Sequence, residues 1–208
     1  MTIYELIFIL LFLGSLAGLL LGALLWRTTT SRKILISLAT AWSVYLLILV
    51  VSDIFSSQKV FKPGEAECFD EMCFAVVGNQ TIPAQAVDPS SSTAASKFTA
   101  VTIRITNHSL GRAESEGGLR GRLYEGGAYI NVSDFAQKAY DAQHGENVRL
   151  THKISSGEST FSVLVFAVPP EMPHPSLTLD HGFTPGYFVI GESPFFHKPD
   201  IHQLPQDR

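Results

Sequence analysis

Cysteine is scarce in this sequence: Cys68 and Cys73 are the only two among 208 residues. A structural zinc site needs four protein ligands and a thioredoxin-type centre uses a Cys-x-x-Cys pair, so neither site is expected. Short catalytic signatures are missing as well, including the Gly-x-Ser-x-Gly elbow, the phosphate-binding loop, the dinucleotide-binding glycine turn and His-Glu-x-x-His. The sequence therefore predicts a non-catalytic protein with no cofactor and no metal centre.

Positive charge is scarce in the second part of the chain. From residue 56 onward, twelve Lys and Arg stand against seventeen Asp and Glu, a net charge of −5, whereas residues 1–55 carry +1. The basic residues form no cluster. Because nucleic-acid binding depends on a basic patch that neutralises phosphates, nucleic acid is not an expected partner.

Charge of either sign is almost missing from two long stretches. Residues 3–26 contain only Glu5, and residues 34–52 contain no charged side chain. About 20 apolar residues in a helix cross the hydrocarbon core of a bilayer, so we expect transmembrane helices at 3–26 and 34–54. The first stretch is too long for a signal peptide, and no Lys or Arg precedes it.

The connector at 27–33 contains Arg27, Arg32 and Lys33. Short loops rich in Lys and Arg remain on the cytoplasmic side of a membrane, so the connector is predicted to be a cytoplasmic loop. Both termini would then lie outside. Residues 56–208 would form a periplasmic or extracellular domain, and the chain would be a multi-pass protein of the cell inner membrane.

Gly14, Gly18 and Gly22 recur every four residues and therefore share one face of the first helix. Small residues at this spacing let two helices approach closely in lipid. They predict either a tight hairpin, with Gly22 near residue 38 and Gly18 near residue 42, or packing against a helix of another protein. The sequence leaves both alternatives open.

The domain after residue 56 has the size of one domain and is rich in turn signals, which favours β-structure. Alternating apolar and polar residues at 97–107 indicate a half-buried strand, and the apolar run at 160–168 indicates a central one. The full set of expected strands is 73–77, 97–107, 121–125, 147–154, 160–168, 176–180 and 186–191. This set predicts an all-β, immunoglobulin-like β-sandwich.

One short helix is expected at 133–145, with Ser133 as its N-cap and Gly145 at its end. Phe135, Ala139 and Tyr140 are predicted to share one face of this helix. Residues 84–96 contain few large apolar side chains and are expected to form a surface loop.

Three segments carry a resemblance to a known family: "YINVSDFAQKAYDAQHGENVRL", "SSGESTFSVLVFAVPPEMPHPSLTL" and "FVIGESPFFHKPDIHQL". They resemble bacterial extracytoplasmic domains with a telokin-like, immunoglobulin-type sandwich, over about residues 64–204. The resemblance implies a sandwich fold and attachment by a membrane segment or lipid. It implies no catalytic residues, because the family has no established activity.

Cys68 and Cys73 are five residues apart, which on a straight strand separates them by about 16 Å. A disulfide requires Cα atoms within about 7 Å, so the segment must turn back, with Asp70 and Glu71 at the tip. A structural disulfide is the leading interpretation. Free buried thiols and a redox or metal role are the alternatives.

Phe195, Phe196 and His197 follow a proline in an expected loop and form a candidate contact surface. Alternatively, the two phenylalanines plug one end of the sandwich. The remaining C-terminal histidines, His174, His181 and His202, are interpreted as solvated loop residues.

Two functions fit these observations. The first is an accessory or structural subunit of a larger membrane complex, in which two helices and an outer domain contact a partner protein. The second is an independent binding module of the cell envelope for a ligand or protein.

Overall fold

The computed structural model describes residues 3–24, 29–83, 87, 97–181 and 198–206. The chain divides into two compact units. The first contains Met1–Gln58 and Phe183–Pro199, and the second contains Lys59–Gly182 and Asp200–Arg208. Each unit is described by itself.

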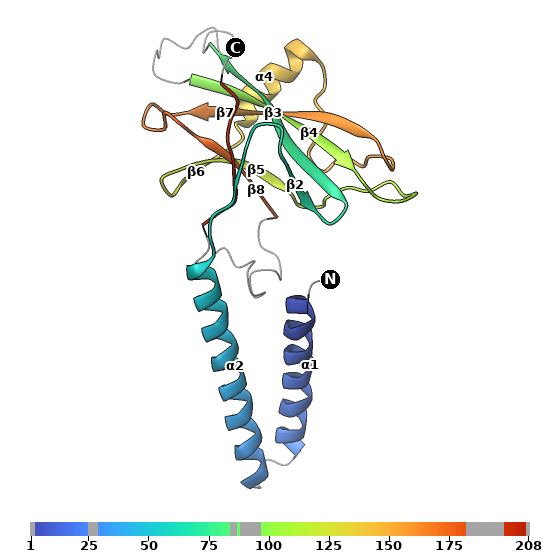
Figure 1. Cartoon of the computed structure of the whole chain (residues 1–208), viewed down its shortest axis with the longest axis vertical. Helices are drawn as coiled ribbons and strands as arrows, with labels where there is room; N and C mark the ends of the chain where they lie inside the picture. The colour runs from blue at the N-terminus through green and yellow to red at the C-terminus, as the bar shows by residue number, and fades with distance from the viewer. Residues whose placement is uncertain (1–2, 25–28, 84–86, 88–96, 182–197, 207–208) are drawn as a thin grey trace. The chain divides into compact units, whose positions relative to one another are not determined.

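Two antiparallel helices, α1 (Ile3–Leu24) and α2 (Thr29–Phe55), make up most of the described part of the first unit (Figure 1). Both are long and apolar enough to cross a membrane. Their apolar side chains are largely exposed, and Leu10, Leu20 and Leu47 each exceed 60% exposure. A helix in a soluble core would bury such side chains.

The helix α2 begins earlier than the sequence predicted. It starts at Thr29, so Arg32 and Lys33 are helical, whereas the expected loop covered 27–33. Hydropathy locates the apolar residues but not the helix ends, because a helix satisfies its own backbone hydrogen bonds and can extend past the apolar stretch.

The glycine face of α1 lies partly inside this hairpin. A β-carbon at Gly18 would lie 3.1 Å from Leu38 Cδ1, and the Ser31 hydroxyl donates to the Gly22 carbonyl at 3.0 Å. At Gly14, the described residues leave the β-carbon position open within 4 Å. The predicted register is wrong by about one turn at Gly18 and two turns at Gly22, because α2 starts at residue 29 and the connection is therefore shorter than expected.

A polar contact joins the two helices near their middles. The Trp42 Nε1–H donates to Ser15 Oγ at 2.8 Å, and the Ser15 hydroxyl donates to the Leu11 carbonyl at 2.7 Å. The Trp42 ring also contacts the rings of Phe8 and Tyr45, in both cases edge to face. The hairpin is therefore held by tight apolar packing and by interhelical hydrogen bonds from Ser31 and Trp42.

The second unit is a sandwich of two sheets with α4 on one outer face (Figure 1). Sheet A has the order β1 (Val60–Phe61), β9 (Ile201–His202), β8 (Ser176–Asp180), β5 (Arg120–Glu125) and β6 (Ala128–Asn131). Sheet B has the order β2 (Ala66–Phe69), β3 (Met72–Ile82), β4 (Lys97–Asn107) and β7 (Ser159–Val168). Every strand pair is antiparallel except β1 with β9.

The alternation predicted for 97–107 is confirmed. Val101, Ile103 and Ile105 are fully buried in the core between the sheets. Sheet A contributes Leu123 and Leu177 to the same core. The other face of sheet B, near α4, forms a second apolar cluster, so the domain has three layers in this region.

The predicted helix is confirmed as α4 (Asp134–His144). Ser133 Oγ accepts from the Ala136 N–H, and Gly145 ends the helix with φ 92°. Ala139 and Tyr140 share the face of the fully buried Ala136, whereas Phe135, which was expected on the same face, is 58% exposed. The cause is the 3.6-residue period, which puts residues 136, 139 and 140 on one face and rotates residue 135 away from it.

Two strand predictions need correction. Residues 147–154 form no strand and make only an isolated bridge between Ile154 and Glu114. The strand β7 lies at the edge of sheet B and not at its centre, which is occupied by β4. The expected strand at 186–191 lies outside the described residues.

Candidate functional site

A proline-lined groove of about 990 Å³ lies at one end of the sandwich. Its walls come from five separate parts of the chain. The lining residues are Pro63, Asn79, Lys97, Thr99, Val168, Pro169, Pro170, Met172, Pro173, His174, Pro175, Ser176, Gln203, Leu204, Pro205 and Gln206. Ligand sites have volumes of about 300–1,000 Å³, so the groove is large enough for one.

The connection between β7 and β8 builds one wall. Lys97 pairs with Val168, where β4 begins and β7 ends. Pro169 and Pro170 follow, and proline cannot donate to a sheet ladder, so the strand stops there. The Met172 N–H donates to the Pro169 carbonyl at 3.1 Å, and the buried Met172 side chain fixes the loop to the core.

The C-terminal segment 203–206 builds the facing wall. The Gln203 N–H donates to the Phe61 carbonyl at 2.9 Å, and Leu204 packs against the main core. The Asn79 side chain donates to the Pro205 carbonyl at 3.2 Å. The Asn79 Oδ1 atom is buried and has no hydrogen-bond partner among the described residues.

The chemistry of the groove differs from that of the whole domain. Six of the described lining residues are prolines, and none is acidic, although the domain carries a net charge of −5. Lys97 supplies a positive charge. Proline rings are rigid and lack an N–H group, so the walls offer preformed apolar surfaces and carbonyl acceptors. The groove can therefore contact an apolar ligand without much loss of its own freedom.

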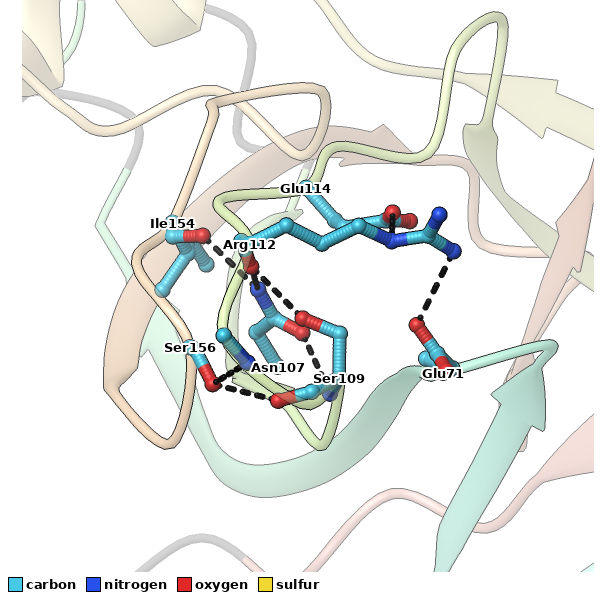
Figure 2. A network of polar contacts seen from close by, with 8 residues as sticks. Glu71, Asn107, Ser109, Arg112, Glu114, Ile154 and Ser156 are labelled. Carbon is cyan, nitrogen blue, oxygen red and sulfur yellow. Dashed lines mark hydrogen bonds and ion pairs between the residues drawn. The ribbon is translucent and has the colours of Figure 1, made fainter.

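A buried polar network lies at the other end of β4 and surrounds Asn107 (Figure 2). The Asn107 amide donates to the carbonyls of Arg112 and Ile154 at 3.1 and 2.8 Å, and its Oδ1 accepts from the Ser109 N–H at 2.8 Å. Asn107 begins an Asn-x-Ser triplet. Its amide is used inside the fold, so this triplet is structural and not an accessible glycosylation acceptor.

The outer members of this network join three loops. Ser156 Oγ accepts from the Gly111 N–H and donates to the Ser109 carbonyl. Figure 2 shows the Arg112 guanidinium between the carboxylates of Glu71 and Glu114. Most of these polar atoms are engaged within the protein, so the network positions loops and does not form a reactive site.

Two histidines of the second unit pair with glutamates. His202 is fully buried, with Nε2 at 2.9 Å from Glu67 Oε2 and its ring stacked on Phe61 at 4.7 Å. His181 Nε2 lies 2.9 Å from Glu116 Oε1. The interpretation of His202 as a solvated loop residue was wrong, because β9 is too short to produce a recognisable strand pattern. The described residues contain no cluster of three or more potential metal ligands.

Cys68 and Cys73 form the predicted disulfide. They lie directly opposite each other in the β2–β3 hairpin, with Cα atoms 4.0 Å apart. Asp70 has a φ of 51° in the two-residue turn, a left-handed conformation that Asp tolerates better than most residues. The fold-back explains why an odd separation still brings the two sulfurs together.

The outer face of sheet A carries an aromatic and charged cluster. Arg122 binds Asp180 through both Nε and Nη2, at 2.8 and 2.7 Å, and its guanidinium lies 4.3 Å from the centre of the Tyr129 ring. Burial raises the pKa of the Tyr129 hydroxyl above its ordinary value, and the charge of Arg122 opposes this effect. The predicted contact residues Phe195, Phe196 and His197 lie outside the described residues.

No protein-family model matches the chain, and no curated protein matches it. Among solved structures, it is similar to an uncharacterised β-sandwich protein from Clostridium difficile 630, at 13% identity over 72% of this chain and 97% of that chain, with a TM-score of 0.40. It is similar to the yjhA protein from Bacillus subtilis, at 13% identity over 70% and 99% of the two chains, with a TM-score of 0.37. A conserved hypothetical protein from Bacillus anthracis gives 13% identity over 58% and 88%, with a TM-score of 0.43. These likenesses carry no argument about function, and the two sheets of the chain itself establish the sandwich.

Proposed function

We propose that this chain is a membrane-anchored extracytoplasmic binding module whose ligand occupies the proline-lined groove. The groove is the observation that carries the proposal. It combines sufficient volume, rigid proline walls and polar groups from residues such as Asn79, Lys97 and Gln203, so it offers both apolar and polar contacts to a ligand. Its ligand is an extended envelope component with both apolar and polar groups and without a net positive charge.

The anchor in this proposal is the α1–α2 hairpin. Its exposed apolar side chains suit lipid, and Arg32 and Lys33 at the start of α2 favour a cytoplasmic connector. A Cys68–Cys73 disulfide suits the oxidising side of the membrane. The fold of the outer domain is proposed to be the telokin-like, immunoglobulin-type sandwich, since antiparallel pairing dominates both sheets.

A second candidate is the accessory subunit of a membrane complex. It needs a close-packing helix face that the hairpin leaves open, and Gly14 offers one such position. Gly18 and Gly22 already lie against α2, which favours a self-contained anchor. If the chain migrates with a large assembly on a native gel, and Gly14→Leu abolishes this co-migration, the subunit role is supported. If the chain migrates in the same way with and without the substitution, the binding-module role is supported.

The orientation is tested by labelling with a membrane-impermeant thiol reagent in intact cells. Thr30→Cys should be protected until the cells are opened, and Lys153→Cys, an exposed position in the sandwich, should react at once. The native cysteines do not react with the reagent because they are joined in a disulfide. Reaction at Thr30→Cys and protection at Lys153→Cys would reverse the proposed topology.

Ligand binding is tested with a photo-reactive amino acid placed on either wall of the groove, at His174 or Gln203, in the full chain in growing cells. Both positions are exposed, and Lys153 provides an exposed control away from the groove. The two groove positions should give adducts of the same mass, and Ser176→Trp, which fills the groove, should suppress both. Adducts that differ between the walls, or that appear equally at the control, would contradict the proposal.

A further inference from the structure

The edges of the two sheets are protected to different degrees. Within the described part of the chain, β1 and β6 are the edges of sheet A, and β2 and β7 are those of sheet B. An edge strand has main-chain N–H and C=O groups without a partner strand, and proteins usually guard such edges against pairing with another chain.

The edge at β7 is closed by hydrogen bonds from neighbouring segments. The Asn147 side chain donates to the Val163 carbonyl at 2.6 Å and accepts from the Val163 N–H at 2.8 Å. The Val165 N–H donates to Gln137 Oε1 at 3.0 Å, and the Val165 carbonyl accepts from the Ser133 N–H at 2.9 Å. These groups cannot pair with a further strand.

The edges at β1 and β2 are guarded by charge, length and proline. The strand β1 has two residues and lies between Lys59 and Lys62, with Pro63 following. The strand β2 carries Glu67, which points inward to His202, and Asp70 stands at its turn. Inward-facing charges and short, charged edges are recognised means of preventing strand addition.

The edge at β6 has neither a charge nor a proline in its sequence, Ala128-Tyr129-Ile130-Asn131. The two-residue turn of the β5–β6 hairpin makes Glu125–Ala128 a hydrogen-bonded pair, so Tyr129 and Asn131 direct their main-chain groups away from β5. No described residue bonds to these groups on that side. The adjacent Arg122 is neutralised by Asp180.

We propose that β6 is a self-association edge, where it pairs antiparallel with β6 of a second copy of this chain. The register follows from the outward groups. Tyr129 of each copy lies opposite Asn131 of the other and exchanges both main-chain hydrogen bonds with it, while Ile130 lies on the two-fold axis. The two copies of sheet A then form one continuous sheet.

A second copy fits this edge better than an unrelated peptide. The strand has no charged side chain, so no like charges face each other across the pairing itself, although each domain has a net charge of −5. The pairing is also symmetric, since each Tyr129 meets an Asn131. Few main-chain hydrogen bonds connect the copies, and such a contact is weak in dilute solution. Two molecules confined to one membrane have a much higher effective concentration, which favours the dimer there.

The register is tested with full-length chains in membrane vesicles under mild oxidation. One chain carries Tyr129→Cys and a differently tagged chain carries Asn131→Cys. The two together should form a disulfide-linked pair, whereas either variant alone should form little, because identical positions lie diagonally across the two-fold axis. Equal cross-linking in all three samples, or cross-linking only to other proteins, would overturn the proposal.

Association itself is measured by energy transfer between labelled full-length chains in vesicles at several protein densities. Asn131→Pro removes an N–H donor from the pairing edge, and Tyr129→Lys places a positive charge on the edge of each copy. Each substitution should therefore lower the energy transfer between chains at least about fivefold. Ala66→Lys on the β2 edge is the matched control and should leave it unchanged. Circular dichroism checks that the variants fold. Density-independent, monomeric behaviour of the native chain, or dimers that survive both substitutions, would refute self-association.

Discussion

Replacing Asn107 provides the sharpest test of how the sandwich is held together. In Asn107→Ala, the buried Ser109 N–H loses its acceptor, which costs about 1–3 kcal/mol. The carbonyls of Arg112 and Ile154 also lose a donor, but each keeps another, from Ser109 Oγ and the Glu114 N–H respectively. Each of these losses costs about 0.5–1.5 kcal/mol. The expected loss in unfolding free energy is about 2–6 kcal/mol, a large share of the stability of a typical domain.

A second substitution at the same position separates hydrogen bonding from packing. Asn107→Asp keeps the size of the side chain but places carboxylate oxygens against two carbonyl oxygens at a fully buried site. At pH 7 it should destabilise the domain more than alanine does. Burial and the facing carbonyls raise the pKa of the new carboxyl group in the folded state, so the penalty should shrink as the pH falls through that pKa.

The assay must report on the sandwich and not on the helices. Both tryptophans, Trp26 and Trp42, lie in the first 55 residues and not in the sandwich domain, so their fluorescence does not report on that domain. Urea unfolding followed by far-UV circular dichroism, with hydrogen exchange at the Ser109 amide, measures the domain directly. Asn131→Ala, at an exposed position, should change stability by less than about 0.5 kcal/mol. The reasoning fails if Asn107→Ala costs no more than this control, or if Asn107→Asp equals the native chain at pH 7.

Three further predictions concern other parts of the sandwich. Gly121→Ala places a methyl group against Leu164 in the core and should destabilise the domain by about 1–3 kcal/mol in the same urea assay. When Leu164→Ala makes room for this methyl group, the double variant should lose less stability than the sum of the two single losses. In unreduced protein, mass spectrometry should find the peptide with Cys68 and Cys73 about 2 Da lighter than its dithiol form, and reduction should cost only about 2 kcal/mol; two freely alkylated thiols would contradict the disulfide. The raised pKa of Tyr129 means that the folded state favours the neutral hydroxyl. The contribution of Tyr129 to the unfolding free energy should therefore be fully present below about pH 10 and be lost as the pH rises through the folded pKa. Tyr129→Phe should remove this part of the loss of stability at alkaline pH.

The sequence was most informative where a local pattern determines the structure. The strict alternation at 97–107 predicted β4 because one of its faces is buried in the main core. Ser133 and Gly145 predicted α4 because capping is a property of the residues next to a helix end. The short spacing of Cys68 and Cys73, together with a plausible turn, predicted the disulfide hairpin.

Contacts between segments that are distant in the sequence explain which features could not be predicted from it. Residues 147–154 alternate like a strand, and Leu150 and Ile154 are indeed buried, but the Asn147 side chain bonds to the edge of β7 in place of a backbone ladder. The proline-lined groove could not be predicted, since its walls come from segments more than 100 residues apart. Its prolines predict where a strand ends, but they do not predict which distant segment lies across the groove from them.

The close fit of Ala136 has a consequence for the solubility of the protein. Ala136 is the fully buried residue of α4. Near the same end of the helix, the Ser133 N–H donates to the Val165 carbonyl and Gln137 Oε1 accepts from the Val165 N–H. A larger side chain at position 136 would lift the helix and release both hydrogen bonds together. The core between the sheets would persist, yet the main-chain N–H and C=O groups of Val165 would become free for pairing with another chain. Aggregation could therefore begin from a change of a few atoms in a surface helix, long before the sandwich itself unfolds.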